Sequence, residues 1–90
     1  MEATMRSMAV MPDKGDIYFV AVVDYGDEAL NVKAKLDFNR FDPTLFLEEL
    51  REKIAEGLDI KTWNVSMHND TIIAKIGLWR EHFQRMGLVE

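Results

Sequence analysis

The sequence predicts an α+β fold with the order β-β-α-β-α, and three patterns carry this prediction. Residues 17–25 are almost entirely apolar, whereas residues 30–39 alternate between apolar and polar side chains. Residues 70–86 instead carry apolar side chains at spacings of four, three, four and three, which is typical of one helical face. A continuous apolar run indicates a strand covered on both faces, and an alternating run indicates a strand with one wet face. We therefore expect a sheet with residues 17–25 at its centre.

The first two strands are expected to form a hairpin. Residues 26–29 (Gly-Asp-Glu-Ala) supply the loop, and Tyr25 and Leu30 would then share a face across it. Tyr18, Val20 and Val22 would form the outer face of the first strand. The inner face is expected to contain Ile17, Phe19, Ala21, Val23, Val32, Leu36, Phe38, Val65 and Met67.

Residues 1–15 are rich in methionine and end in the turn-like segment 11–15 (Met-Pro-Asp-Lys-Gly). Three alternatives remain for them: a helix with Met5, Met8 and Met11 on one face, an extra strand over residues 4–11 at the sheet edge, or a frayed tail. The predicted organisation is accordingly an N-terminal tail or edge strand, 1–15, followed by a single α+β domain, 16–90.

A helix is predicted over residues 42–56. Asp42 is a favourable N-cap, and Pro43 suits the first helical position because its missing N–H would have no partner there. Gly57 is expected to end the helix. The predicted apolar stripe consists of Leu47, Leu50, Ile54 and Leu58, and Glu49 and Lys53 are spaced for an i, i+4 ion pair.

A third strand is predicted over residues 60–68, with Trp63 facing the core. The second helix is expected over residues 70–86, with Asp70 as its cap, Gly87 as its end and Trp79 on its buried stripe. Gly77 inside this helix costs about 1 kcal/mol relative to Ala. A strand through Ile76 therefore remains an alternative to one continuous helix.

These elements predict a sheet with two helices on one face. A right-handed crossover through the first helix places residues 60–68 beside residues 17–25. The resulting three-stranded order has the hairpin's first strand in the middle. Such an antiparallel sheet is partly ferredoxin-like in architecture.

Composition excludes several classes of function. The 90 residues include no cysteine, which excludes disulfides, thiolate catalysis and zinc–thiolate sites. A net charge of −5 disfavours direct nucleic-acid binding, because an acidic protein gains nothing from neutralising phosphates. It favours a neutral or basic protein partner. No signal peptide or segment of membrane-spanning length is recognisable, so we expect a cytoplasmic protein without membrane attachment.

No group of side chains predicts catalysis, a metal site or a cofactor site. His68 and His82 lack converging partners and are interpreted as surface residues. The carboxylates of residues 24, 27 and 28 do not have the spacing of a calcium loop. The five glycines are isolated, so no phosphate-binding loop is formed. We expect a protein that is not an enzyme, with no metal and no cofactor.

The outer sheet face is the predicted partner-binding site. It combines apolar Tyr18, Val20 and Val22 with polar neighbours that include Lys33 and Lys35, and an apolar patch with a polar rim is typical of protein contact sites. Self-association as a homodimer and coverage by residues 1–11 both remain open. A secondary acidic surface is predicted on the first helix, formed by Glu48, Glu49, Glu52 and Glu56.

The predicted function is a small acidic non-enzymatic protein-binding module that acts by occupying a partner protein's surface. A stoichiometric inhibitor or an adaptor fits this description, including a phage-type inhibitor of a host nucleic-acid-processing complex. The alternative is a small-molecule-binding regulatory domain that functions as a dimer. That alternative requires a polar, glycine-lined pocket.

Overall fold

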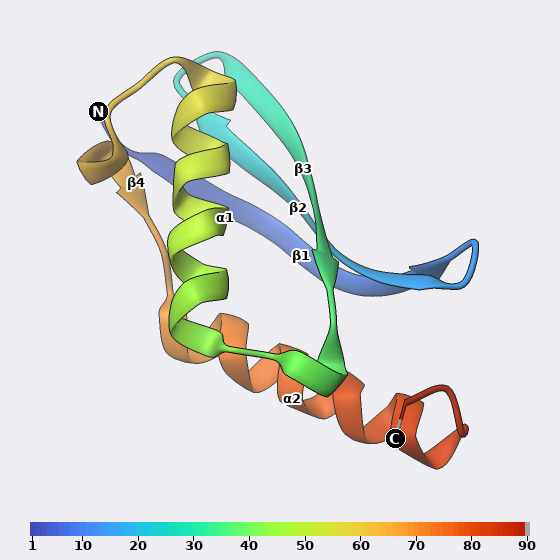
Figure 1. Cartoon of the computed structure of the whole chain (residues 1–90). Helices are drawn as coiled ribbons and strands as arrows, with labels where there is room; N and C mark the ends of the chain where they lie inside the picture. Colours follow the sequence, from blue (N-terminus) through green and yellow to red (C-terminus); the bar gives the residue numbers. More distant parts are fainter. Residues whose placement is uncertain (90) are drawn as a thin grey trace.

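The computed structural model describes residues 1–89. It has the predicted α+β fold, with one strand more than the predicted order β-β-α-β-α. Three strands precede the first helix, which gives the order β-β-β-α-β-α (Figure 1). The strands are β1 (Ala3–Asp13), β2 (Asp16–Tyr25), β3 (Glu28–Leu36) and β4 (Val65–Ser66). The helices are α1 (Pro43–Leu58) and α2 (Asn69–Arg85), with short 3-10 helices η1 (Phe38–Arg40) and η2 (Thr62–Asn64).

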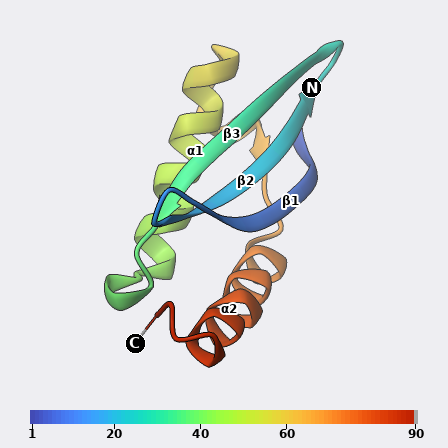
Figure 2. The same ribbon diagram turned by 90° about the vertical axis from the view of Figure 1, so that its right-hand side faces the viewer.

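The N-terminal segment forms a long strand of the sheet. The strand order is β3-β2-β1-β4, and Figure 2 shows β2 between β1 and β3. We expected residues 60–68 to pair with residues 17–25. This prediction is wrong, because β1 occupies that side of β2. A two-residue turn at Lys14 and Gly15, both with positive φ, joins β1 to β2. Such a local hairpin closes at a lower entropic cost than a strand that must return after a helix.

Strand β4 is far shorter than the predicted strand over residues 60–68. It pairs parallel to β1 through only two residue pairs, Ala3 with Val65 and Thr4 with Ser66, so the sheet is mixed rather than fully antiparallel. The preceding residues form η2, closed by a hydrogen bond from the Asn64 N–H to the Lys61 carbonyl. This turn leaves Trp63 72% exposed, so its predicted core position is wrong.

Strands β2 and β3 form the predicted hairpin, but its loop is two residues shorter than predicted, so the two strands pair in a different register. Gly26 and Asp27 form the turn, Tyr25 pairs with Glu28, and Val23 pairs with Leu30. Gly26 adopts a positive φ of 60°, a conformation that favours glycine. Tyr25 and Leu30 lie on the same face, as predicted.

Helix α1 begins where the sequence predicts and ends later. The Asp42 side chain accepts a hydrogen bond from the Leu45 N–H, and Pro43 occupies the first helical position. The C-cap is Asp59 in the left-handed conformation, not Gly57. Gly57 instead lets the helix approach β3, because a Cβ there would lie 2.8 Å from a Leu30 methyl group. The buried stripe of α1 is Phe46, Leu50, Ile54 and Ala55, with Leu47 and Leu58 only partly buried.

Helix α2 is one continuous helix, so the alternative strand through Ile76 is wrong. His68 takes the N-cap position that we expected for Asp70, which lies in the first turn. Gly87 follows the helix with a positive φ, in agreement with the predicted end. Ile72, Ile76 and Phe83 are buried, whereas Trp79 is half-buried and Met86 is exposed.

The core lies between the inner sheet face and the two helices. In Figure 1, α1 crosses in front of the strands, α2 runs along the lower end of the sheet, and the β1–β2 turn projects beyond both. Phe19 of β2 meets Phe46 of α1 edge-to-face at 5.7 Å between ring centroids. The rings of Phe38 in η1 and Phe83 in α2 also pack together, with 6.2 Å between their centroids. The predicted inner-face residues are buried, except Ile17 and Met67, which are partly buried.

Candidate functional site

Three strands form the outer face, which carries side chains in rows of three. We define this surface, called the outer face below, by the residues that point away from the helices. Val20 is central, paired with Ala9 of β1 and Lys33 of β3. Because pleated strands alternate side chains between faces, the rows on either side use the same strands. They are Ser7–Val22–Asn31 toward one end and Met11–Tyr18–Lys35 toward the other.

The outer face is uncovered, and its apolar residues are partly accessible. Tyr18, Val20 and Val22 are half-buried, and Met11 is 46% exposed. Both helices pack on the other face, so no element of the described chain lies over these side chains. The predicted alternative in which residues 1–11 cover this face is wrong, because β1 lies beside β2 in the sheet.

The small side chains on either side of Val20 and Val22 leave a hollow in the outer face. Its volume is about 470 Å³, and its lining comes from β1, β2 and β3. The lining residues are Ser7, Met8, Ala9, Val20, Ala21, Val22, Asn31, Val32 and Lys33. The hollow is mainly apolar and contains no glycine.

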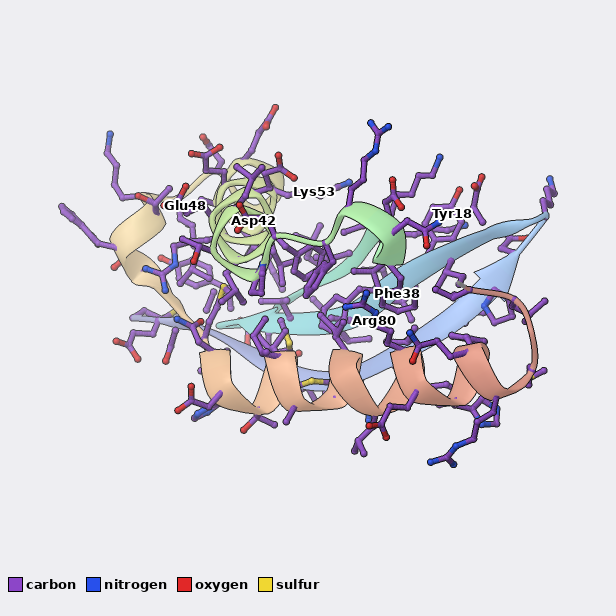
Figure 3. All side chains as sticks on the ribbon, turned by 60° about the horizontal axis from the view of Figure 1, so that its bottom comes forward. Tyr18, Phe38, Asp42, Glu48, Lys53 and Arg80 are labelled. Carbon is purple, nitrogen blue, oxygen red and sulfur yellow. The ribbon has the colours of Figure 1, made fainter. Side chains whose placement is uncertain are left out.

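Tyr18 and Lys33 form one unit at the edge of this hollow. The Lys33 ammonium group lies 4.2 Å from the centroid of the Tyr18 ring and donates a 2.9 Å hydrogen bond to the Asp13 carboxylate. This hydrogen bond, together with the negative charge of Asp13, raises the pKa of Lys33 above its ordinary value of 10.5. Figure 3 shows Tyr18 on the side of the β1–β2 turn, away from Glu48 of α1.

Cross-strand ion pairs surround the apolar centre. Arg6 donates two hydrogen bonds of 2.8 and 2.7 Å to Asp24, which raises the pKa of Arg6. The Lys35 ammonium group lies 3.4 Å from an Asp16 carboxylate oxygen. With the Asp13–Lys33 pair, the rim contains three cations and three carboxylates, so it contributes no net charge.

Both edges of the sheet beside the outer face are protected against further strand pairing. On β3, the Lys53 ammonium group of α1 donates a 2.8 Å hydrogen bond to the Lys33 carbonyl (Figure 3). The predicted Glu49–Lys53 ion pair is therefore replaced by a contact between helix and sheet. On β1, Pro12 lacks an N–H, and a register shift between Met5 and Ser7 interrupts the ladder. Prolines, bulges and lysines are devices that discourage edge-to-edge pairing.

The predicted acidic surface exists on α1 and is separate from the outer face. Glu48, Glu49, Glu52 and Glu56 are all exposed. Their predicted exposure is confirmed, while their role as a binding surface stays a prediction. They lie on the helix side of the molecule, so the structure does not join them to Tyr18, Val20 and Val22.

Sequence reasoning missed the contribution of β1 to the outer face. Ser7, Ala9 and Met11 belong to this surface, and Met8 and Val10 face inward. The sequence signal for this strand was the alternation of residues 7–11. This signal is weak, because alanine, serine and methionine are all tolerated in many types of secondary structure. The ion pair of Arg6 with Asp24 had no sequence signal, since it depends on the register of two strands.

Both histidines are exposed. His68 lies at the start of α2. The centroid of the His82 ring lies 5.4 Å from that of the Trp79 ring. Within residues 1–89, no three histidine, aspartate or glutamate side chains gather in a way that could hold a metal ion. The buried Nε of Arg80 in α2 has no hydrogen-bond partner among the described residues.

In comparisons with known proteins, no protein family, curated protein or solved structure matches the chain. No helix in residues 1–89 is long and apolar enough to cross a membrane.

Proposed function

We propose that this protein is a small acidic non-enzymatic binding module that acts by occupying the surface of a partner protein through its outer face. The observation that carries the proposal is the uncovered strip of Tyr18, Val20 and Val22, continued by Met11 of β1. Folding normally buries such side chains, and an apolar strip with a polar rim is the usual composition of a contact site. A stoichiometric inhibitor or an adaptor would act in this way.

The geometry favours a protein over a small molecule at this face. Small-molecule sites enclose most of the ligand and place a few polar groups around it. The hollow spreads across three strands, is mainly apolar and opens to solvent. It suits a protruding apolar side chain of a partner better than an enclosed ligand.

A capture experiment with matched variants tests the proposal. The wild-type chain, Val20→Lys and Leu78→Lys are immobilised and exposed to lysate of the native host, and bound proteins are quantified by mass spectrometry. Leu78 is a control because it is 69% exposed on α2, away from the outer face. We expect a protein held by the wild type and Leu78→Lys but lost with Val20→Lys. Equal capture by all three would contradict the proposal.

Binding kinetics with the captured protein separate the outer face from the acidic surface of α1. If the outer face carries the affinity, Val20→Lys raises the dissociation rate about tenfold or more, because buried anchors govern the lifetime of a complex. Salt then has little effect. Replacing Glu48, Glu49, Glu52 and Glu56 with Gln would instead slow association if the acidic surface guided encounter. A steep salt dependence with an unaffected Val20→Lys variant would assign binding to α1.

A further inference from the structure

We infer that the outer face, when free of its partner, pairs with the outer face of a second copy of this chain about a two-fold axis. The inference rests on the proposed function, since it takes this face to be a protein-binding surface. It goes further by naming an occupant. The second copy would cover the same apolar strip that the partner needs, so the dimer would be the resting form and the partner would displace one copy.

The distribution of charge supports a second copy. The rim of the outer face has no net charge, whereas the whole chain has a charge of −5. The excess negative charge is therefore carried by the rest of the chain, including the exposed carboxylates of α1. Two copies that meet through their outer faces keep these helices on opposite outsides. Repulsion between like charges, which would oppose contact through the helices, is then weakest.

The arrangement of the rows is also compatible with two-fold pairing. An isologous interface requires one surface to be complementary to itself. The outer face has large side chains at one end, Met11 and Tyr18, and a hollow that extends from the central row at Val20 to Ser7 and Val22 at the other end. A two-fold axis near Val20 places the large end of each copy over the hollow of the other. It also brings the Arg6–Asp24 end toward the Lys35–Asp16 end, and both signs of charge are present at each end.

The protected edges direct association to the face. A shared edge would need free backbone groups along β1 or β3. The Lys33 carbonyl already accepts from Lys53, Pro12 of β1 has no N–H to donate, and the register of β1 with β2 shifts near Arg6. Pairing of two faces leaves all these contacts unchanged, and stacked sheets about 10 Å apart are a common packing arrangement.

The size of the face predicts a dimer that exchanges readily. Strand spacing of about 4.8 Å and a rise of about 3.3 Å per residue give a flat area of roughly 400 Å² for three strands of this length. Stable interfaces bury about 800 Å² of accessible surface on each partner. The outer face thus offers about half the area of a stable interface, so we expect weak pairing, which suits an occupant that a partner must displace.

Sedimentation over a range of concentrations tests the inference. The mass of the wild type should rise from 10.4 kDa toward twice that value between about 1 µM and about 1 mM, where weak contacts dissociate. Val20→Glu should stay monomeric with an unchanged circular dichroism spectrum. Leu78→Glu should dimerise like the wild type. A wild type that stays monomeric throughout, or a Val20→Glu variant that dimerises normally, would overturn the inference.

The absence of cysteine gives a second test of the same geometry. A single cysteine at Ala9 would lie beside the proposed axis, whereas one at exposed Ala74 of α2 would lie on the helix side. We expect Ala9→Cys to form a covalent dimer at least about tenfold faster than Ala74→Cys under mild oxidation at equal concentration. Equal rates would contradict pairing through the outer face.

The two proposals fail in different ways. A monomeric wild type that still captures a host protein through Val20 would reject the second copy and leave the proposed function intact. A dimer sensitive to Val20→Glu that captures no other protein would support self-pairing and reject partner binding.

Discussion

Single residues determine where the helices of this protein begin and end. Asp42 caps the start of α1 with its side chain, while Asp59 ends the helix in a left-handed conformation that non-glycine residues seldom adopt. The sequence identified the first residue because an Asp-Pro pair has a local physical meaning. It did not identify the second, because Gly57 offers a better intrinsic cap and is needed elsewhere, against Leu30.

The cap at Asp42 gives a stability prediction. Asp42→Ala should lower the free energy of unfolding by about 1 kcal/mol, because the Leu45 N–H loses its 3.1 Å hydrogen bond to the side chain. Asp42→Asn should retain most of this stability, since Asn caps helices equally well. Urea unfolding measures both variants. Equal losses for Ala and Asn would show that charge, not capping, is responsible.

The two glycines inside helices should respond differently to alanine. Gly77 has open space where a Cβ would be added, so Gly77→Ala should raise stability by about 1 kcal/mol through the higher helix propensity of alanine. Gly57→Ala should gain less, because its Cβ would press on Leu30 and force that side chain to move. Thermal melts of the two variants provide the comparison. A larger gain at Gly57 would contradict the close contact between α1 and β3.

At the scale of elements, helix α2 depends on its aromatic contacts. Phe83 is buried, and its ring packs between those of Phe38 and Trp79. Phe83→Ala should lower the free energy of unfolding by about 3–5 kcal/mol, because it leaves a cavity between α2 and η1. Chemical denaturation measures this loss. A loss smaller than that of Asp42→Ala would mean that α2 does not form part of the cooperative core.

The elements with strong local patterns were predictable, and those that depend on distant partners were not. The β2–β3 hairpin and both helices follow from residues close together in sequence. Residues 60–68 alternate as a strand would, yet only Val65 and Ser66 pair, because β1 already occupies the place beside β2. Strand formation depends on the available neighbour as much as on the residues themselves.

The same division applies to the candidate site. Tyr18, Val20 and Val22 were predicted because a two-sided apolar strand must expose one face when helices cover the other. Lys33 and Lys35 followed from the alternation of β3. The contribution of β1 and the ion pairs of the rim required the register between strands, which local sequence does not define.

At the scale of the whole molecule, charge is separated between two sides. The outer face is neutral because its cations are paired, and the pKa of Lys33 is raised first by its hydrogen bond to Asp13. A group whose pKa is raised on folding stabilises the folded state fully at a pH below its pKa in the unfolded chain, which is about 10.4 for lysine. This stabilisation is lost as the pH rises through the pKa of the group in the folded protein. The Lys33 contact is therefore complete at neutral pH.

The raised pKa of Lys33 predicts how stability should depend on pH. The difference in unfolding free energy between the wild type and Lys33→Met should stay constant from about pH 7 to about pH 9. It should shrink above about pH 10.5, where the unfolded chain releases the Lys33 proton while the folded protein still retains it. Urea unfolding across this range measures the difference, with Lys61→Met as the control because Lys61 is exposed near η2. A difference that shrinks below pH 9 would contradict the raised pKa.

The position of β2 has a consequence for the way the protein opens. Strand β2 pairs along its length with a neighbour on each side, whereas β1 beyond Thr4 and β3 have a neighbour strand on one side only. Opening β2 requires both ladders to break, so its amides should exchange with solvent only in the rarest and largest fluctuations. Amides on the open side of β1 should exchange sooner. The outer face thus lies on the most persistent strand of the chain, so Tyr18, Val20 and Val22 would be held in position before a partner or a second copy binds.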